Sequence, residues 1–170
     1  MIFGIPTELF LQIHVAISLI GIASGLVVLY GLLSGKPLAG WTALFLLTTV
    51  LTSLTGFPLP PFGFDPPRAI GIILLVLLAA AVVALYVFHL AGAWRWIYIV
   101  TAVASLYLNV FVAVVQSFQK LSFLQPLAPT QSEPPFKVTQ AVVLTLFIGL
   151  AVAAGIRFRP GLDRTPDRVP

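Results

Sequence analysis

The chain has 170 residues, of which 59% are hydrophobic and 8% are charged, and its mean hydropathy is +1.08. A soluble domain carries about a quarter charged residues, so nine Lys or Arg and five Asp or Glu are too few to cover such a chain, and lipid must cover most of it. The small net charge of +4 gives no support to nucleic-acid binding, and the absence of cysteine excludes disulfides, thiolate metal sites and cysteine nucleophiles.

Charged residues divide the chain into five long uncharged stretches, which are the candidate membrane spans. A helix needs ~20 apolar residues to cross ~30 Å of hydrocarbon, and only the second stretch is clearly short of that length. The stretches cover residues 9–34, 41–57, 69–91, 96–119 and 138–156. We predict an all-α integral membrane protein, with one bundle of about five transmembrane helices over residues 1–156 and a basic cytoplasmic tail over residues 157–170.

Glycine and proline account for the breaks between these spans. Gly35 and Pro37 follow the first span, a proline-rich run at 58–67 follows the second, and four prolines interrupt the connection before the fifth. The break near Gly92 is weak, but without it residues 69–119 would form one helix of about 75 Å, far longer than a bilayer core. We therefore expect a tight hairpin there, with an aromatic belt at the interface. The belt residues are Trp94, Trp96 and Tyr98.

The distribution of Lys and Arg predicts the orientation of the bundle. With the C-terminus inside, Lys36, Arg95 and the four Arg residues of the tail lie in the cytoplasm. Only Arg68, Lys120 and Lys137 lie outside. Because cytoplasmic loops carry an excess of positive charge, we predict an N-out, C-in topology.

Polar and small residues within the spans show which helix faces pack inward. In the first span they follow helical spacing and form one stripe. The stripe consists of His14, Ser18, Gly21 and Gly25. The fourth span carries a similar face, and the second span has a cluster of Thr and Ser. We therefore expect the first, second and fourth helices to pack together.

The predicted topology brings several of these side chains to similar depths in the outer half of the bilayer. At 1.5 Å per residue, His14 lies ~9 Å below Glu8, and Asn109 lies ~16 Å below Lys120. We predict an outer-half polar pocket as the candidate ligand-binding site. Its residues are His14, Ser18, Thr52, Asn109, Gln116 and Gln140.

The residue types of this pocket leave several functions open. The side chains can hydrogen-bond one another and simply hold the helices together, or they can bind a small ligand such as a quinone in an apolar slot. Haem b on His14 is a further alternative, although His89 lies too far away, near the inner face, to ligate the same haem.

The sequence argues against catalysis in the membrane. No Asp or Glu lies inside a span, so a carboxylate dyad or a Ser-His-Asp triad has no acid near the pocket, and no spacing matches a metal motif. We expect a non-catalytic accessory or small-ligand-binding protein that contacts the lipid bilayer, and a membrane-protein partner or a homo-oligomer stays open. The alternatives are a redox protein using haem or quinone at His14, and a small transporter or channel acting as an oligomer.

Four segments carry a resemblance to a known group of proteins. They are residues 52–57 (TSLTGF), 89–98 (HLAGAWRWIY), 106–111 (LYLNVF) and 127–136 (LAPTQSEPPF). With these segments the chain resembles a family of small multi-pass membrane proteins from alphaproteobacteria that has no assigned activity. The resemblance implies a location in the bacterial inner membrane and says nothing about chemistry. The proline-rich segment 127–136 is expected to be stiff, and it either covers the pocket, meets a partner or serves as a spacer.

Overall fold

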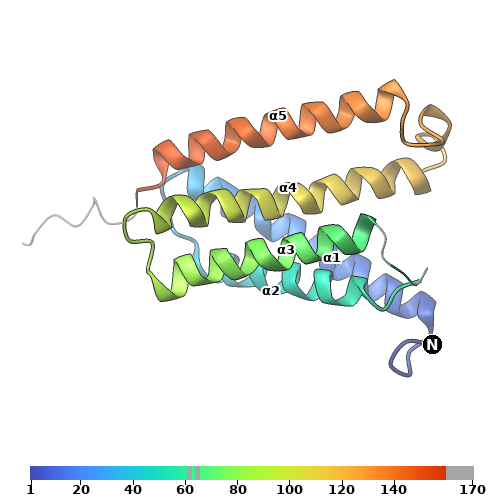
Figure 1. Cartoon of the computed structure of the whole chain (residues 1–170), viewed down its shortest axis with the longest axis horizontal. Coiled ribbons are helices and arrows are strands. Elements are labelled where there is room, and N and C mark those ends of the chain that lie inside the picture. Colours follow the sequence, from blue (N-terminus) through green and yellow to red (C-terminus); the bar gives the residue numbers. More distant parts are fainter. Residues whose placement is uncertain (61–62, 64–65, 160–170) are drawn as a thin grey trace, which may run out of the picture.

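The protein is a bundle of five long helices, seen in a computed structural model that describes residues 1–60, 63 and 66–159 (Figure 1). The helices are α1 (Thr7–Leu33), α2 (Ala39–Gly56), α3 (Pro66–Val82), α4 (Trp94–Lys120) and α5 (Pro134–Arg157). A π-helical turn, Val83–Val87, continues α3, and a 3-10 turn, Gln125–Leu127, lies between α4 and α5. All five are long and apolar enough to span a membrane. The predicted all-α multi-pass fold is confirmed, and the N-out orientation stays a prediction.

The helices extend beyond the uncharged stretches of the sequence at most of their ends. Glu8, Arg68, Arg95, Lys120 and Lys137 all lie within the first or last turns of helices. Long charged side chains can reach water from such positions while the backbone stays helical, so charge marks the edge of the hydrocarbon rather than the end of a helix. Of the predicted tail, residues 160–170 lie outside the described residues.

Four of the helices form a ring, and the fifth stands beside it. Each of the pairs α1–α2, α2–α3, α3–α4 and α4–α1 is in contact, whereas α5 packs on α4 and α1 from outside (Figure 1). One end of the bundle holds the N-terminus and the α2–α3 and α4–α5 connections, and we call it the N-terminal end. The opposite, C-terminal end holds the α1–α2 and α3–α4 connections.

The middle of the ring is tightly packed around a glycine. A Cβ atom on Gly25 of α1 would lie 2.6 Å from Leu106 Cδ1 of α4 and 2.9 Å from the Phe45 ring of α2. Only a residue without a side chain lets the three helices meet so closely. The predicted association of the first, second and fourth helices is therefore confirmed at this point.

The hairpin expected near Gly92 is present between α3 and α4. The π-helical turn ends α3, and the chain then reverses through positive φ angles at His89 (49°), Leu90 (61°) and Gly92 (54°). Phe88 stacks on Trp94 across the turn, with ring centroids 3.8 Å apart. Tyr98 differs from the expected aromatic belt, because it is 2% exposed and belongs to the core of the bundle.

Arg95 closes the C-terminal end by joining α4 to α5. Its Nη1 donates hydrogen bonds to the carbonyl oxygens of Gly155 (2.9 Å) and Phe158 (2.5 Å). These carbonyls lie at the end of α5, where no intrahelical donor remains and where the helix dipole favours a cation. The neighbouring Trp96 ring lies directly against Gly155, so that any side chain at position 155 would collide with it.

Candidate ligand-binding cavity

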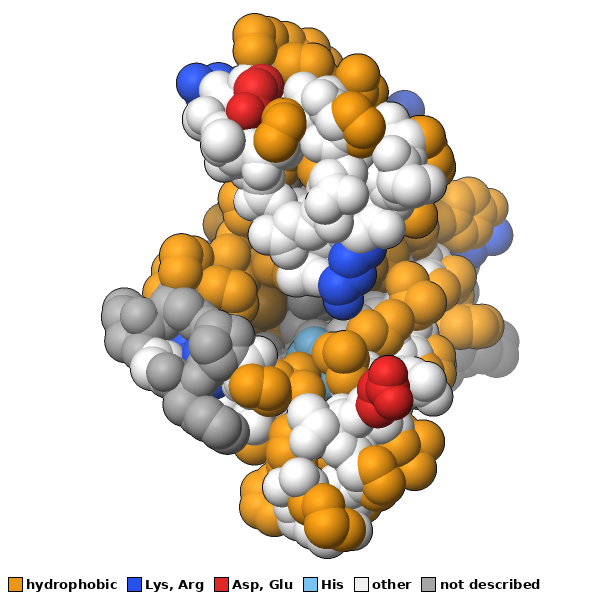
Figure 2. Space-filling view, turned by 90° about the vertical axis from the view of Figure 1, so that its right-hand side faces the viewer, with side chains coloured by type: hydrophobic (Ala, Val, Ile, Leu, Met, Phe, Trp, Pro, Cys, Tyr) orange, Lys and Arg blue, Asp and Glu red, His pale blue; other side chains and the backbone are white. Residues whose placement is uncertain are grey.

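A cavity of about 780 Å³ occupies the N-terminal half of the four-helix ring. Its walls come from the first turns of α1 and α3 and the last turns of α2 and α4. Figure 2 looks onto this end of the molecule, where the surface is hollowed between protruding lobes and a histidine is visible inside the hollow. The volume falls within the range of ~300–1,000 Å³ typical of small-molecule sites.

Five of the six residues predicted for the pocket line this cavity. They are His14, Ser18, Thr52, Asn109 and Gln116. Gln140 does not line it: α5 stands outside the ring, and Gln140 donates from Nε2 to the Phe111 carbonyl oxygen of α4 at 3.2 Å. Depth along the helix was predicted from the sequence, but the side of α4 on which α5 packs was not.

The hydrogen bonds of His14 indicate which nitrogen of its ring carries the proton. Nδ1 lies 2.8 Å from the Thr55 hydroxyl, and that hydroxyl donates to the Leu51 carbonyl oxygen at 2.7 Å. Because the hydroxyl proton is used on the backbone, Thr55 accepts from Nδ1–H, and Nε2 is left as an acceptor in the neutral ring. Nε2 has no partner among the described residues, and it is not sealed from the cavity.

Part of the polar lining serves helix packing. Asn109 donates from Nδ2 to the Thr49 hydroxyl at 3.2 Å and so joins α4 to α2. The Ser18 hydroxyl donates to the His14 carbonyl oxygen of its own helix at 2.7 Å. The interpretation as interhelical hydrogen bonding is confirmed for Asn109 but not for Ser18, which bonds only within its own helix.

Other polar groups of the lining have no partner in the described part of the protein. The Thr52 hydroxyl is buried without a hydrogen bond, unlike Thr48 and Thr55, whose hydroxyls donate to carbonyls four residues earlier. The Gln116 amide, which is not sealed off, also makes none. Because an unpaired polar group in an apolar setting costs free energy, these groups are candidates to bind something other than protein.

Two cationic residues at the rim were not predicted as part of the site. Arg68 of α3 and Lys120 of α4 both line the cavity. The Arg68 Nη2 donates to the carbonyl oxygens of Phe57 (3.1 Å) and Leu59 (2.6 Å), which holds the end of α2 against α3. The sequence could have indicated that both residues lie near the pocket, since each is at a span boundary on the same predicted side of the membrane as His14.

The proline-rich segment 127–136 does not cover the cavity, because none of its residues belongs to the lining. Glu133 organises this connection by accepting hydrogen bonds from the Thr130 hydroxyl (2.8 Å), the Thr130 amide (3.1 Å) and the Ser132 amide (3.0 Å). These donors, the Thr130 hydroxyl first, lower the pKa of Glu133 below its ordinary value of 4.5. Gln131 adds a bond to the Val115 carbonyl oxygen at 3.3 Å, so the segment lies against α4.

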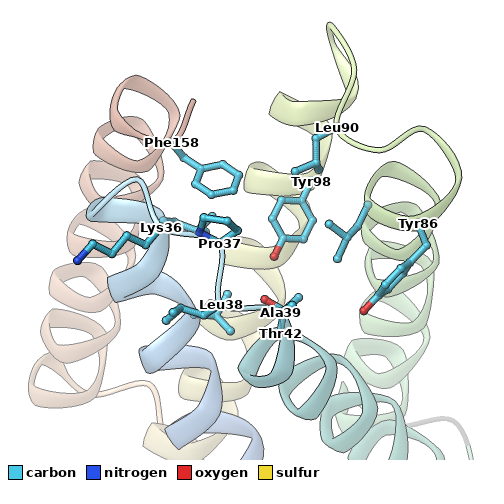
Figure 3. A pocket seen from close by; sticks show the side chains of 12 residues that line it. Lys36, Pro37, Leu38, Ala39, Thr42, Tyr86, Leu90, Tyr98 and Phe158 are labelled. Carbon is cyan, nitrogen blue, oxygen red and sulfur yellow. The ribbon is translucent and has the colours of Figure 1, made fainter. Parts of the chain in front are cut away.

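A second, smaller cavity of about 210 Å³ lies at the C-terminal end of the same ring. Figure 3 shows its lining, with the Tyr98 hydroxyl directed toward Thr42 and the Lys36 side chain pointing away from the space. The two cavities share no lining residue. Along each helix of the ring, buried core residues such as Phe45, Leu78 and Leu106 lie between them.

Comparison of the chain with protein-family models, with curated proteins and with solved structures gives no match.

Proposed function

We propose that this chain is a non-catalytic, multi-pass protein of the bacterial inner membrane that binds a small ligand in the N-terminal cavity, on the periplasmic side. The observation that carries the proposal is the convergence of His14 and Gln116, whose unused hydrogen-bonding groups are open, on one cavity of about 780 Å³, beside the buried and unpaired hydroxyl of Thr52. By contrast, Asn109 is paired with Thr49 across the helix interface. The location follows from the resemblance to alphaproteobacterial proteins and from the charge distribution.

The experiment that tests this proposal fills the cavity and looks for a lost ligand. Ala113 lines the cavity, so Ala113→Trp places a large ring inside it. Val152→Trp is the matched control, because Val152 lies on the outer face of α5 and is 56% exposed. Native mass spectrometry of the protein, extracted from membranes in mild detergent, should show a bound small molecule in the wild type and the control but not in Ala113→Trp. The same bound mass in all three proteins, or no bound molecule in any, would overturn the proposal.

A second candidate function is redox chemistry with haem or quinone, of which haem binding is favoured by the tautomer of His14. Histidines that ligate metals commonly donate their other ring nitrogen to a hydrogen-bond acceptor, and Nδ1 of His14 does so to Thr55. The same tautomer cannot donate from Nε2 to a quinone carbonyl, for which the Gln116 amide is the available donor.

Absorbance of the purified protein separates these possibilities. A Soret band that sharpens on reduction with dithionite and disappears in His14→Ala would make His14 a haem ligand. A colourless protein of unchanged fold in both forms would exclude haem and leave a colourless ligand. The transporter or channel alternative has weaker support, because the apolar layer around Gly25 closes the ring between the two cavities.

A further inference from the structure

We infer that the cavity binds an anionic amphiphile, whose headgroup lies at Lys120 and whose hydrocarbon part extends down the cavity. This inference rests on the proposed function and names its ligand class. Three features of the cavity support it, namely the sign of the charge at the rim, the order of side chains with depth, and the groups left unpaired.

The rim of the cavity is positively charged. Lys120 and Arg68 face it from α4 and α3, and no Asp or Glu occurs among the described residues of the lining. Lys120 is exposed and forms no ion pair or hydrogen bond with the described part of the protein. A cation beside an apolar cavity in a membrane attracts anionic lipid headgroups. The guanidinium of Arg68 holds the α2–α3 connection through its bonds to backbone carbonyls, so the inference rests on Lys120.

The polarity of the cavity changes with depth in the way that an amphiphile requires. On α4 the lining follows one helical stripe, and Gln116 lies one turn, ~6 Å, below Lys120. On α3 the lining begins with Pro67 and Arg68 and ends with Leu74 about two turns deeper. The remaining deep walls are mostly aliphatic and include Val15, Leu19, Ile22 and Val112. The deep polar residues Ser18 and Asn109 are already hydrogen-bonded within the protein.

The unpaired groups fit a headgroup near the rim. The Gln116 amide can donate two hydrogen bonds but has no protein partner in the described residues. It lies on the same face of α4 as the Lys120 ammonium. An ammonium and an amide one turn apart suit a carboxylate or a phosphate, whose oxygens accept several bonds at once.

The test compares two probes that differ only in charge. A fluorescent single-chain fatty acid and its methyl ester are titrated into the full-length protein in a neutral detergent. We expect the acid to bind at least tenfold more tightly than the ester. Lys120→Gln should remove this difference, and Lys120→Arg should restore most of it. Lys137→Gln is the matched control, because Lys137 lies at the same end of the bundle but does not line the cavity.

The outcomes separate this inference from the proposed function. If both probes bind equally and Ala113→Trp abolishes both, the cavity binds amphiphiles without selecting an anion, and only the inference is wrong. If Lys137→Gln and Lys120→Gln weaken binding of the acid equally, the selectivity arises from general surface charge, and the inference is again wrong. If both probes bind and Ala113→Trp does not change their binding, the inference and the proposed function are both wrong. A single-chain alkyl phosphate that binds more tightly than the acid, with the same dependence on Lys120, supports the inference and identifies the headgroup as a phosphate.

Discussion

Two cationic residues at opposite ends of the helical ring, Arg95 and Lys120, have different surroundings. At the C-terminal end, Arg95 is bonded to two carbonyl oxygens of α5, and the Trp96 ring fills the space beside Gly155. At the N-terminal end, Lys120 has no such bonds within the described residues and faces a cavity of about 780 Å³. A charge that is satisfied by the backbone builds the fold, whereas a charge left beside an open cavity is available to a ligand.

The largest expected difference concerns substitutions that add volume. Gly25→Ala should destabilise the protein by about 1–3 kcal/mol, because its Cβ overlaps with Leu106 and Phe45 in a packed layer. Gly149→Ala is the control, since nothing lies within 4 Å of a Cβ at that position on α5. Thermal unfolding in detergent measures both. Equal melting temperatures for the two variants would show that the middle of the ring is not tightly packed.

Removal of the two cations should sharpen the comparison between the ends. Arg95→Leu leaves the terminal carbonyls of α5 without donors, and a loss of about 1.5–3 kcal/mol follows from hydrogen bonds to a charged group. Lys120→Leu should change stability by no more than about 0.5 kcal/mol, as exposed substitutions do. Unfolding in a series of denaturing detergent mixtures compares the variants. A larger loss for Lys120→Leu than for Arg95→Leu would reverse the assignment of the two roles.

A smaller effect is expected for the hydrogen bonds that pack the cavity wall. A double-mutant cycle with Asn109→Leu and Thr49→Val should give a coupling free energy of about 0.6 kcal/mol, the average for such pairs in membranes. The same cycle between Gln116→Leu and Thr49→Val should give none, because no bond joins those side chains. Coupling of similar size in both cycles would indicate that the cavity collapses around the substitutions.

The smallest effect is local and depends on pH. The lowered pKa of Glu133 means that the order of residues 130–133 is complete above pH 4.5 and is lost as the pH falls through the lowered value. NMR shifts of the Thr130 and Ser132 amides should therefore titrate with a midpoint below 4.5, and Glu133→Gln should abolish the titration. A midpoint at or above 4.5 would exclude the hydrogen bonds described for this carboxylate.

Hydropathy predicts the five helices because the bilayer imposes the same length on each of them. The depths of His14 and Asn109 were predictable for the same reason, since a helix rises by a fixed distance per residue. The neighbours of a residue around the helix axis were not predictable from the sequence, because they depend on which helices pack together. Gln140 therefore faces α4 rather than the cavity, and Tyr98 faces the core rather than the membrane interface.

The rim cations illustrate a second limit of the sequence. Lys120 and Arg68 end uncharged stretches, and a charge at a span boundary indicates the membrane interface before it indicates a site. Their role at the cavity depends on the ring of four helices, which brings the end of α4 beside the start of α3. The arrangement of helices thus carries information that the order of charges along the chain does not.

The polar character of α2 bears on how the protein enters the membrane. Among the candidate spans, α2 is the shortest and has the lowest hydropathy, so on its own it partitions into lipid least well. Most of its hydroxyls, though not that of Thr52, bond within the helix or to its neighbours, as Thr55 does to His14 of α1. During biogenesis α1 is made first and offers α2 a partner that lipid cannot provide. The first two helices are therefore expected to insert together as one hairpin, before the rest of the ring assembles around them.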